Sequence, residues 1–409
     1  MARMNPRLQM EYRYLVLSCA VVGVVAMMTM PVAAQAAGQV AGSTYSPPRT
    51  PWGDPDLQGL WRGLHEVPFV RPPQFEGREF RTDAEIAELE RRAEASNELR
   101  RLGKQENRGF RDQPNYNSVV GYSPEQARFS RRTSAIIDPP DGHLPPWTVE
   151  QVKRYEWRES ISFGRGDADW TVDRPASERC IPIMRTPALT NWGMATSGRP
   201  AGPQATAGTV QGGAAFFVNT SDGGDPRRIL QGPGYVAIVT EEGVETYHII
   251  PLDGSPHLGP KFKHWLGDSR GHWEGNTLVV ETTNIKYPYP IVLTYQDGGT
   301  GFYPGDGEKL RFVERFTRIG PDSIDYRYTV EDPSVYTRPY TVEHELTRDD
   351  GYKVSSPICH EGHDDMPAAL GSARNDEETH IQNQLDMVQE REPRLKELKE
   401  EAIRSAEPR

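Results

Sequence analysis

Three ionisable side chains of this 409-residue chain fall among apolar residues on predicted strands. Glu314 alternates with Phe312, and His344 and His248 alternate in the same way with mainly apolar neighbours. Successive side chains point to opposite faces of a strand, so the face shared with apolar residues is the interior one. Desolvation in a common cavity would move the pKa values of a carboxyl group and two imidazoles toward neutrality, which suits acid and base catalysis. We therefore predict Glu314, His344 and His248 as catalytic residues.

Two tyrosines extend this interior face on the strand after Glu314. Tyr326 and Tyr328 are two residues apart, and we predict that they contact the substrate or donate a proton to it. The alternative is structural: Glu314 would pair with Arg315 or Arg338 at a barrel mouth, and each histidine would be a hydrogen-bonded core residue. A single β-bulge would also shift the alternation.

Residues 263–275, with the sequence KHWLGDSRGHWEG, form a second group of candidates. Two tryptophans among charged side chains are typical of a rim where aromatic faces stack on a ligand and charges orient it. Asp268 and Arg270 are expected to form an ion pair that fixes the turn into a hairpin. The predicted substrate-binding residues of this segment are His264, Trp265, His272 and Trp273.

A third group lies at residues 359–365, which read CHEGHDD. His360 and His363, with neighbouring carboxylates, could bind a divalent metal as part of a site completed elsewhere, which would indicate a metal-dependent hydrolase. The spacing is not His-Glu-x-x-His, and Gly362 argues against a helix. We favour His360 and Glu361 as ligand contacts, and we expect neither a metal nor a cofactor.

The first 36 residues have the three-part layout of an export signal. A basic start precedes an apolar run from Leu15 to Val32, and Ala34-Gln35-Ala36 precedes the expected cleavage site. A single-pass membrane anchor is the alternative, but Pro31 interrupts the run and small residues follow it. We therefore predict a periplasmic or secreted protein with no membrane attachment after cleavage.

Cys180 and Cys359 are the cysteines that would remain after cleavage. An even number in an oxidising compartment predicts one disulfide, which would close a loop of roughly 180 residues and contribute about 2 to 4 kcal/mol. A thiolate nucleophile beside His360 is the alternative. We consider it the weaker one, because neither cysteine begins a helix that would lower its pKa.

Charge and composition narrow the choice of partner. Loss of three arginines and one glutamate with the leader changes the formal net charge from −11 to −13. Nucleic-acid binding requires clustered lysine and arginine, and no basic stripe is present, so we expect no nucleic-acid partner. With 35 prolines and 38 glycines, one large domain with irregular connections fits better than two compact cores.

Helix and loop signals divide the chain into five parts. Thr82 and Glu85 form a capping box that opens a helix ending near Gly103, and a second helix is expected from Thr148 to about Ser160. The Gly-rich loop could be a lid over a pocket. The parts are a signal peptide at 1–36, a wrapping region with one or two helices at 37–192, a Gly-rich loop at 193–226, a barrel-like core at 227–374 and a charged helical tail at 375–409.

Alternating segments separated by turn sequences predict the core. Eight strands of this kind leave exposed edges unless the sheet closes. The predicted fold is therefore mainly β: an antiparallel meander that closes into a barrel-like, calycin-like sheet, with irregular N-terminal segments and a few helices. The strands are expected at 235–240, 244–250, 268–274, 277–283, 310–319, 323–330, 338–347 and 352–356, after a short strand at 56–61.

The segment WLGDSRGHWEGNTLVVETTN at 265–284 resembles a large family of uncharacterised secreted bacterial proteins. The resemblance implies export and a shared fold, and no catalytic residue is carried over from it. The chain departs from the family pattern at 198–213 and 287–307. Further matching stretches are PDLQGLW at 55–61, IDPPDG at 137–142, SERC at 177–180, IPLDG at 250–254, VERFT at 313–317 and CHEG at 359–362.

Together these features predict an exported protein that binds a small, partly apolar molecule. Cofactor-free lyase, isomerase or hydrolase chemistry at Glu314, His344 and His248 would make it an enzyme. A non-catalytic periplasmic binding or carrier protein is the main alternative, in which the same side chains only orient the ligand.

Overall fold

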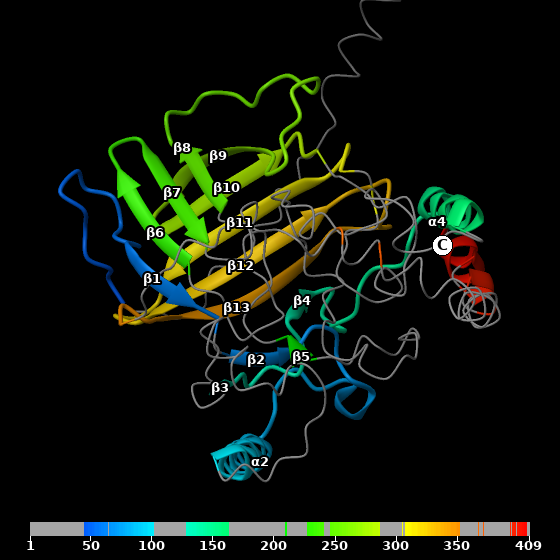
Figure 1. Cartoon of the computed structure of the whole chain (residues 1–409), viewed down its shortest axis with the longest axis horizontal. Coiled ribbons are helices and arrows are strands. Elements are labelled where there is room, and N and C mark those ends of the chain that lie inside the picture. The colour runs from blue at the N-terminus through cyan, green and yellow to red at the C-terminus, as the bar shows by residue number, and fades with distance from the viewer. Residues whose placement is uncertain are drawn as a thin grey trace, which may run out of the picture. The chain divides into compact units, whose positions relative to one another are not determined.

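The computed structural model describes residues 45–63, 65–101, 128–162, 209–210, 227–240, 246–286, 305, 307–351, 367, 371, 393, 395–397 and 399–406. All of them belong to one compact unit, residues 45–409. Figure 1 shows the dominant element, a strongly curved sheet formed by most of the strands. Within the described part of the chain, no helix is both long and apolar enough to cross a membrane.

The sheet follows a nine-strand path in the order β8-β7-β6-β1-β13-β12-β11-β10-β9, and all pairings along it are antiparallel. A tenth strand, β4 (Ile136–Asp138), pairs with β13 off this path. The nine strands are β1 (Gly59–Arg62), β6 (Arg227–Gly232), β7 (Tyr235–Thr240), β8 (Thr246–Pro251), β9 (Asp268–Glu274), β10 (Thr277–Thr283), β11 (Arg311–Arg318), β12 (Ser323–Glu331) and β13 (Tyr340–Arg348).

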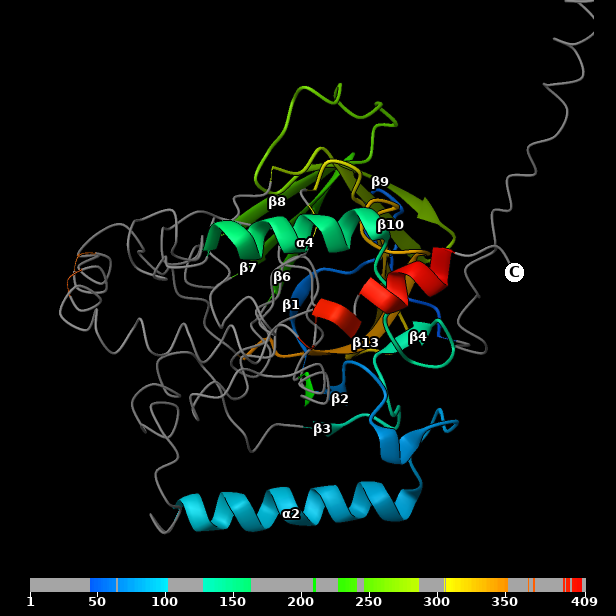
Figure 2. The ribbon, with the colours of Figure 1, turned by 90° about the vertical axis from the view of Figure 1, so that its right-hand side faces the viewer.

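The two ends of the path, β8 and β9, come back together, so the sheet is a nearly closed barrel. Figures 1 and 2 both show β8 beside β9 and β10. A twisted sheet of this many strands leaves few free edges when it curls on itself. The predicted fold class, a mainly β antiparallel sheet that closes into a barrel, is confirmed.

Most of the predicted strands agree closely with the structure. The segments 235–240, 268–274 and 277–283 are β7, β9 and β10 without any shift. The strands β8, β11, β12 and β13 differ from the prediction by two residues or fewer at each end. The segment 352–356 lies outside the described residues.

Two short strands complete the barrel, and their pairing was not predicted. Gly59–Arg62 lies between β13 and β6, where Trp61 is opposite both Arg348 and Arg227. The strand β6 precedes a tight turn at Pro233-Gly234 and pairs with β7. The N-terminal part of the chain therefore supplies barrel strands as well as peripheral segments.

The core lies inside the barrel and consists of alternate residues from each strand. In β11, β12 and β13, every second residue is buried, as expected for strands with one face toward an apolar interior. Phe312 stacks on Tyr328 with ring centroids 5.3 Å apart, which favours a fixed arrangement of the interior aromatics. Other fully buried side chains are Ile238, Val280, Ile324, Val330 and Val342.

Two helices and a small second sheet lie outside the barrel path. The helix α2 (Asp83–Arg101) begins at the predicted capping box, because Thr82 N–H donates to Glu85 Oε2 (2.8 Å) and Glu85 N–H donates to Thr82 Oγ1 (3.3 Å). The helix α4 (Val149–Ser162) is the second predicted helix. The remaining elements are β2 (His65–Pro68), β3 (Arg128–Phe129), β5 (Thr209–Val210) and the single turn η1 (Pro73–Phe75).

Several predictions concern residues that the structure does not describe. They are the signal peptide at 1–36, the disulfide between Cys180 and Cys359, and the 359–365 segment with His360, Glu361 and His363. Of the Gly-rich loop at 193–226, only Thr209 and Val210 are described, as β5. In the tail, residues 393, 395–397 and 399–406 are helical.

Candidate functional site

Glu314 and His344 lie on the interior face of neighbouring parts of the barrel wall. Register places Glu314 opposite Tyr328, and His344 opposite Tyr326, across the three adjacent strands β11, β12 and β13. Glu314 is 1% exposed and His344 is 5% exposed. Alternation along these strands therefore brings four polar side chains to one patch inside the barrel.

Glu314 is held by a hydrogen bond within this patch. The Tyr326 hydroxyl donates to Glu314 Oε1 over 2.7 Å. Burial raises the pKa of Glu314 to about 8, although the hydrogen bond from Tyr326 and the charge of Arg227 act in the opposite direction. The carboxyl group is therefore mainly protonated at neutral pH. The alternative ion pair of Glu314 with Arg315 or Arg338 is not found, because Arg315 pairs with Glu274 and Arg338 with Asp138.

His344 is a neutral imidazole in the same patch. Burial lowers its pKa to about 3, and electrostatic interactions with Arg227 and His65 act in the same direction. The prediction that desolvation would move the pKa values of the histidines toward neutral pH was wrong. Burial disfavours the charged form of an imidazole and therefore moves its pKa downward, away from pH 7. The ring of His344 stacks on Tyr328 with centroids 6.4 Å apart.

Three buried polar atoms of this patch have no hydrogen-bond partner among the described residues. They are Glu314 Oε2, the Tyr328 hydroxyl and His344 Nε2. Each comes from a different strand, and all three residues share the interior face. We call Glu314, Tyr326, Tyr328 and His344 the interior polar patch.

A buried arginine that the sequence analysis missed acts on this patch. Arg227, in β6, is 2% exposed. Its positive charge partly offsets the rise that burial causes in the pKa values of Glu314 and Tyr326, and it adds to the fall in the pKa of His344. The available signal was the alternation of Arg227 with the buried Ile229 in β6. It was overlooked because this strand follows a Gly-rich region and contains few apolar residues.

His248 belongs to a different place, the junction between β8 and β9. Its Nε2 lies 2.5 Å from Ser269 Oγ, and Ser269 Oγ lies 2.6 Å from Thr282 Oγ1. Burial lowers the pKa of His248 to about 3. The prediction grouped His248 with Glu314 and His344, whereas its hydrogen bond joins the two strands at the barrel junction.

The predicted rim residues do not gather on one side of the sheet. In β9, Trp273 packs against the core, whereas His272 is exposed and lies 3.1 Å from Glu274. His264 is exposed, and Trp265 is half-buried with Lys286 Nζ 4.3 Å from its ring centroid. Alternation along β9 explains the separation of His272 from Trp273, because consecutive residues face opposite sides.

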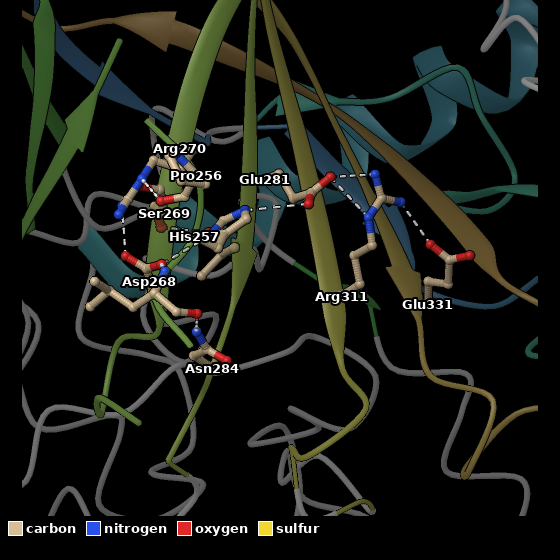
Figure 3. Close-up of polar contacts among 11 residues, drawn as sticks. Pro256, His257, Asp268, Ser269, Arg270, Glu281, Asn284, Arg311 and Glu331 are labelled. Carbon is tan, nitrogen blue, oxygen red and sulfur yellow. Dashed lines mark hydrogen bonds and ion pairs between the residues drawn. The ribbon is translucent and has the colours of Figure 1, made fainter. Parts of the chain in front are cut away.

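A polar network covers the outer face of β9 to β12 (Figure 3). His257 Nδ1 lies 3.1 Å from Asp268 Oδ2, and its Nε2 lies 3.3 Å from Glu281 Oε1. Arg311 links Glu281 to Glu331. The network continues across the four strands β9 to β12 and ties the connection between β8 and β9 to the barrel wall.

Asp268 is the most buried acid of this network. Arg270 Nη1 donates to Asp268 Oδ1 over 2.6 Å, which is the ion pair that the sequence predicted. Burial raises the pKa of Asp268, but hydrogen bonds from Leu258 N–H and His257, with the charge of Arg270, outweigh it and place the pKa below its ordinary value. His257 was not identified from the sequence, because it lies in a connection without periodicity.

Metal chemistry receives no support from the described residues, which include no group of three or more His, Cys, Asp or Glu side chains that could hold a metal ion. His360 and His363 are outside this part of the chain. Searches with the sequence matched no protein-family model and no curated protein.

Proposed function

We propose that the protein binds a small, partly apolar molecule inside the barrel, against the interior polar patch. The observation that carries this proposal is the set of three buried polar atoms without partners in the described chain: Glu314 Oε2, the Tyr328 hydroxyl and His344 Nε2. Buried polar groups are nearly always hydrogen-bonded, and leaving one unsatisfied costs about 1 to 3 kcal/mol. A ligand with complementary groups would satisfy them.

The surroundings of the patch suit a molecule with an apolar or aromatic part. Phe312 stacks on Tyr328, and Phe316 packs at a tilt against Tyr326 with ring centroids 4.7 Å apart, so aromatic rings flank Glu314 on both sides. Pockets of this composition bind ligands through apolar contact and use a few polar groups to fix orientation. The neutral carboxyl of Glu314 would donate a hydrogen bond through Oε2 while Oε1 accepts from Tyr326.

Catalysis is the second candidate, and the raised pKa of Glu314 favours it. A carboxyl group with a pKa of about 8 holds its proton at neutral pH and is placed to act as a general acid. His344, neutral and free of a hydrogen bond at Nε2 within the described chain, would orient the substrate through a hydrogen bond, because a pKa of about 3 makes this imidazole a weak base. A cofactor-free lyase, isomerase or hydrolase step would use this pair.

We further propose that the protein is exported, either to the periplasm or beyond the cell. The three-part leader at 1–36 and the resemblance to secreted bacterial proteins support this proposal. An oxidising compartment would also permit the disulfide between Cys180 and Cys359.

Two substitutions in the interior polar patch distinguish a non-catalytic carrier from an enzyme. Small molecules that remain bound to the purified protein are identified by native mass spectrometry, and their affinity and turnover are then measured with Glu314→Gln and His344→Ala. A carrier loses affinity in both variants, whereas an enzyme keeps binding and loses turnover. Thr317→Val, on the outer face of β11, is the matched control. Absence of any bound molecule in the wild type would argue against the proposal.

A further inference from the structure

The junction between β8 and β9 differs from every other junction of the barrel. Along the path from β8 round to β9, each strand is joined to the next by a backbone hydrogen-bond ladder. Between β8 and β9 themselves, no backbone pairing is found within the described residues, although the strands are in contact. We call this junction the seam.

Side chains close the seam. His248 Nε2 and Ser269 Oγ are 2.5 Å apart across it, and the Thr282 hydroxyl, 2.6 Å from Ser269 Oγ, fixes the serine from the next strand. Close packing continues beside this bond. A Cβ atom placed on Gly271 would come within 2.8 Å of Ile250 Cγ2, so the strands approach closely only because residue 271 is glycine.

The seam borders the interior of the barrel. Register puts Ser269 opposite Thr282, and Thr282 opposite Phe312, which lies on the same face as Glu314. Ser269 is 4% exposed and Thr282 is fully buried. A separation of β8 from β9 at this point would therefore connect solvent with the interior.

We propose that the seam opens to admit small molecules to the interior. The hydrogen bond between His248 and Ser269, which we call the latch, holds it closed. The claim that a ligand enters by this route rests on the proposed function. Opening elsewhere in the barrel would break a ladder of backbone hydrogen bonds, whereas opening here separates side chains. Segments held by fewer hydrogen bonds open locally at lower free energy.

Ser269 is better explained as part of a latch than as a nucleophile. Activation of a serine requires a base that can take its proton. Burial holds the pKa of His248 at about 3, so this imidazole is a weak base. It also stays neutral through the physiological pH range, which keeps the hydrogen bond intact.

The test measures access to the interior without any ligand. A reporter cysteine replaces Val280, which is fully buried on β10 and opposite both Gly271 and Glu314. A second reporter replaces Ala135, which is fully buried just before β4, on a part of the fold joined to β13. Iodoacetamide labelling of each reporter in the full chain is followed by peptide mass spectrometry, which separates these sites from the native cysteines.

Ser269→Ala removes the latch. We expect it to raise the labelling rate at position 280 about tenfold, because a tenfold change corresponds to the loss of about one buried hydrogen bond. The labelling rate at position 135 should stay within about twofold of its value without the substitution. The control Thr317→Val removes the hydroxyl contact between Thr277 and Thr317 (2.8 Å), across the fully laddered β10–β11 junction, and should change neither rate. Thr282→Val is a second latch variant, expected to act in the same direction with a smaller effect.

Equal acceleration at positions 280 and 135 would overturn the inference, because it would mean that global unfolding exposes both reporters. No acceleration at position 280 in either latch variant would overturn it as well. Neither result bears on the proposed function, because labelling needs no bound molecule. Conversely, a failure to find any ligand leaves the labelling result as evidence for an opening seam.

Discussion

The Tyr326 hydroxyl donates a 2.7 Å hydrogen bond to Glu314 Oε1 inside a barrel of apolar side chains. This contact fixes one oxygen of the carboxyl group and leaves Oε2 without a partner in the described chain. Glu314 is therefore positioned by the protein on one side and free to interact on the other. In this respect Glu314 differs from the charged side chains on the outer face of the barrel, which form ion pairs with each other.

Glu314 should make the protein more stable at mildly acidic pH than at alkaline pH. Its pKa rises from 4.5 to about 8 on folding, so its contribution is fully present below pH 4.5 and is lost as the pH rises through 8. The unfolding free energy of the wild type should fall between pH 5 and pH 9. In Glu314→Gln this fall should be smaller by roughly 2 to 5 kcal/mol. Urea unfolding at several pH values measures this. Parallel curves for the variant and the wild type would contradict the assignment.

His344 should make the protein less stable in acid, whereas Glu314 makes it less stable at alkaline pH. The pKa of His344 falls from 6.5 to about 3 on folding, so the stability linked to the neutral form is present above pH 6.5 and is lost as the pH falls toward 3. His344→Phe keeps an aromatic ring beside Tyr328 and removes the titration. Circular dichroism should show an acid-unfolding midpoint at lower pH than in the wild type. An unchanged or higher midpoint would count against a buried neutral histidine.

The interior strands could be predicted from local alternation, whereas closure of the barrel could not be predicted in detail. Alternation placed Glu314, Tyr328 and His344 on one face because β11, β12 and β13 are consecutive and regular. The pairing of Trp61 with Arg348 joins segments from opposite ends of the chain. No local pattern encodes such a contact, so the position of β1 required the structure.

The polar sites were less predictable than the strands. His257 reaches Asp268 and Glu281 from an irregular connection, where side-chain direction does not follow a period. His248 contacts Ser269 because β8 and β9 lie next to each other. These two strands are the ends of the strand path, so they meet only when the whole sheet closes. The sequence identified the correct side of β8 for His248 but not its partner.

Asp268 should stabilise the fold more than the exposed acids of the same network. It is 7% exposed and accepts hydrogen bonds from Leu258 N–H and Arg270. We expect Asp268→Asn to lower the unfolding free energy by about 1 to 3 kcal/mol. The control Glu331→Gln, at the exposed end of the network, should cost less than about 1 kcal/mol. Urea unfolding at pH 7 compares them, and equal losses would refute the central role of Asp268.

Mature protein from the exported fraction should carry one disulfide between Cys180 and Cys359. Peptide mapping without reduction should recover the two cysteine peptides as a linked pair, and reduction should lower the unfolding free energy by about 2 to 4 kcal/mol. Cys180→Ser provides the matched unlinked protein. Two free thiols in the exported protein would contradict this prediction.

Binding inside the barrel is the claim on which the functional account depends. A crystal structure of protein purified with its bound molecule tests it most directly. We predict density for a small molecule inside the barrel, with polar atoms within hydrogen-bond distance of Glu314 Oε2, the Tyr328 hydroxyl and His344 Nε2. Water alone at those three atoms, or density for a small molecule that contacts none of them, would contradict it.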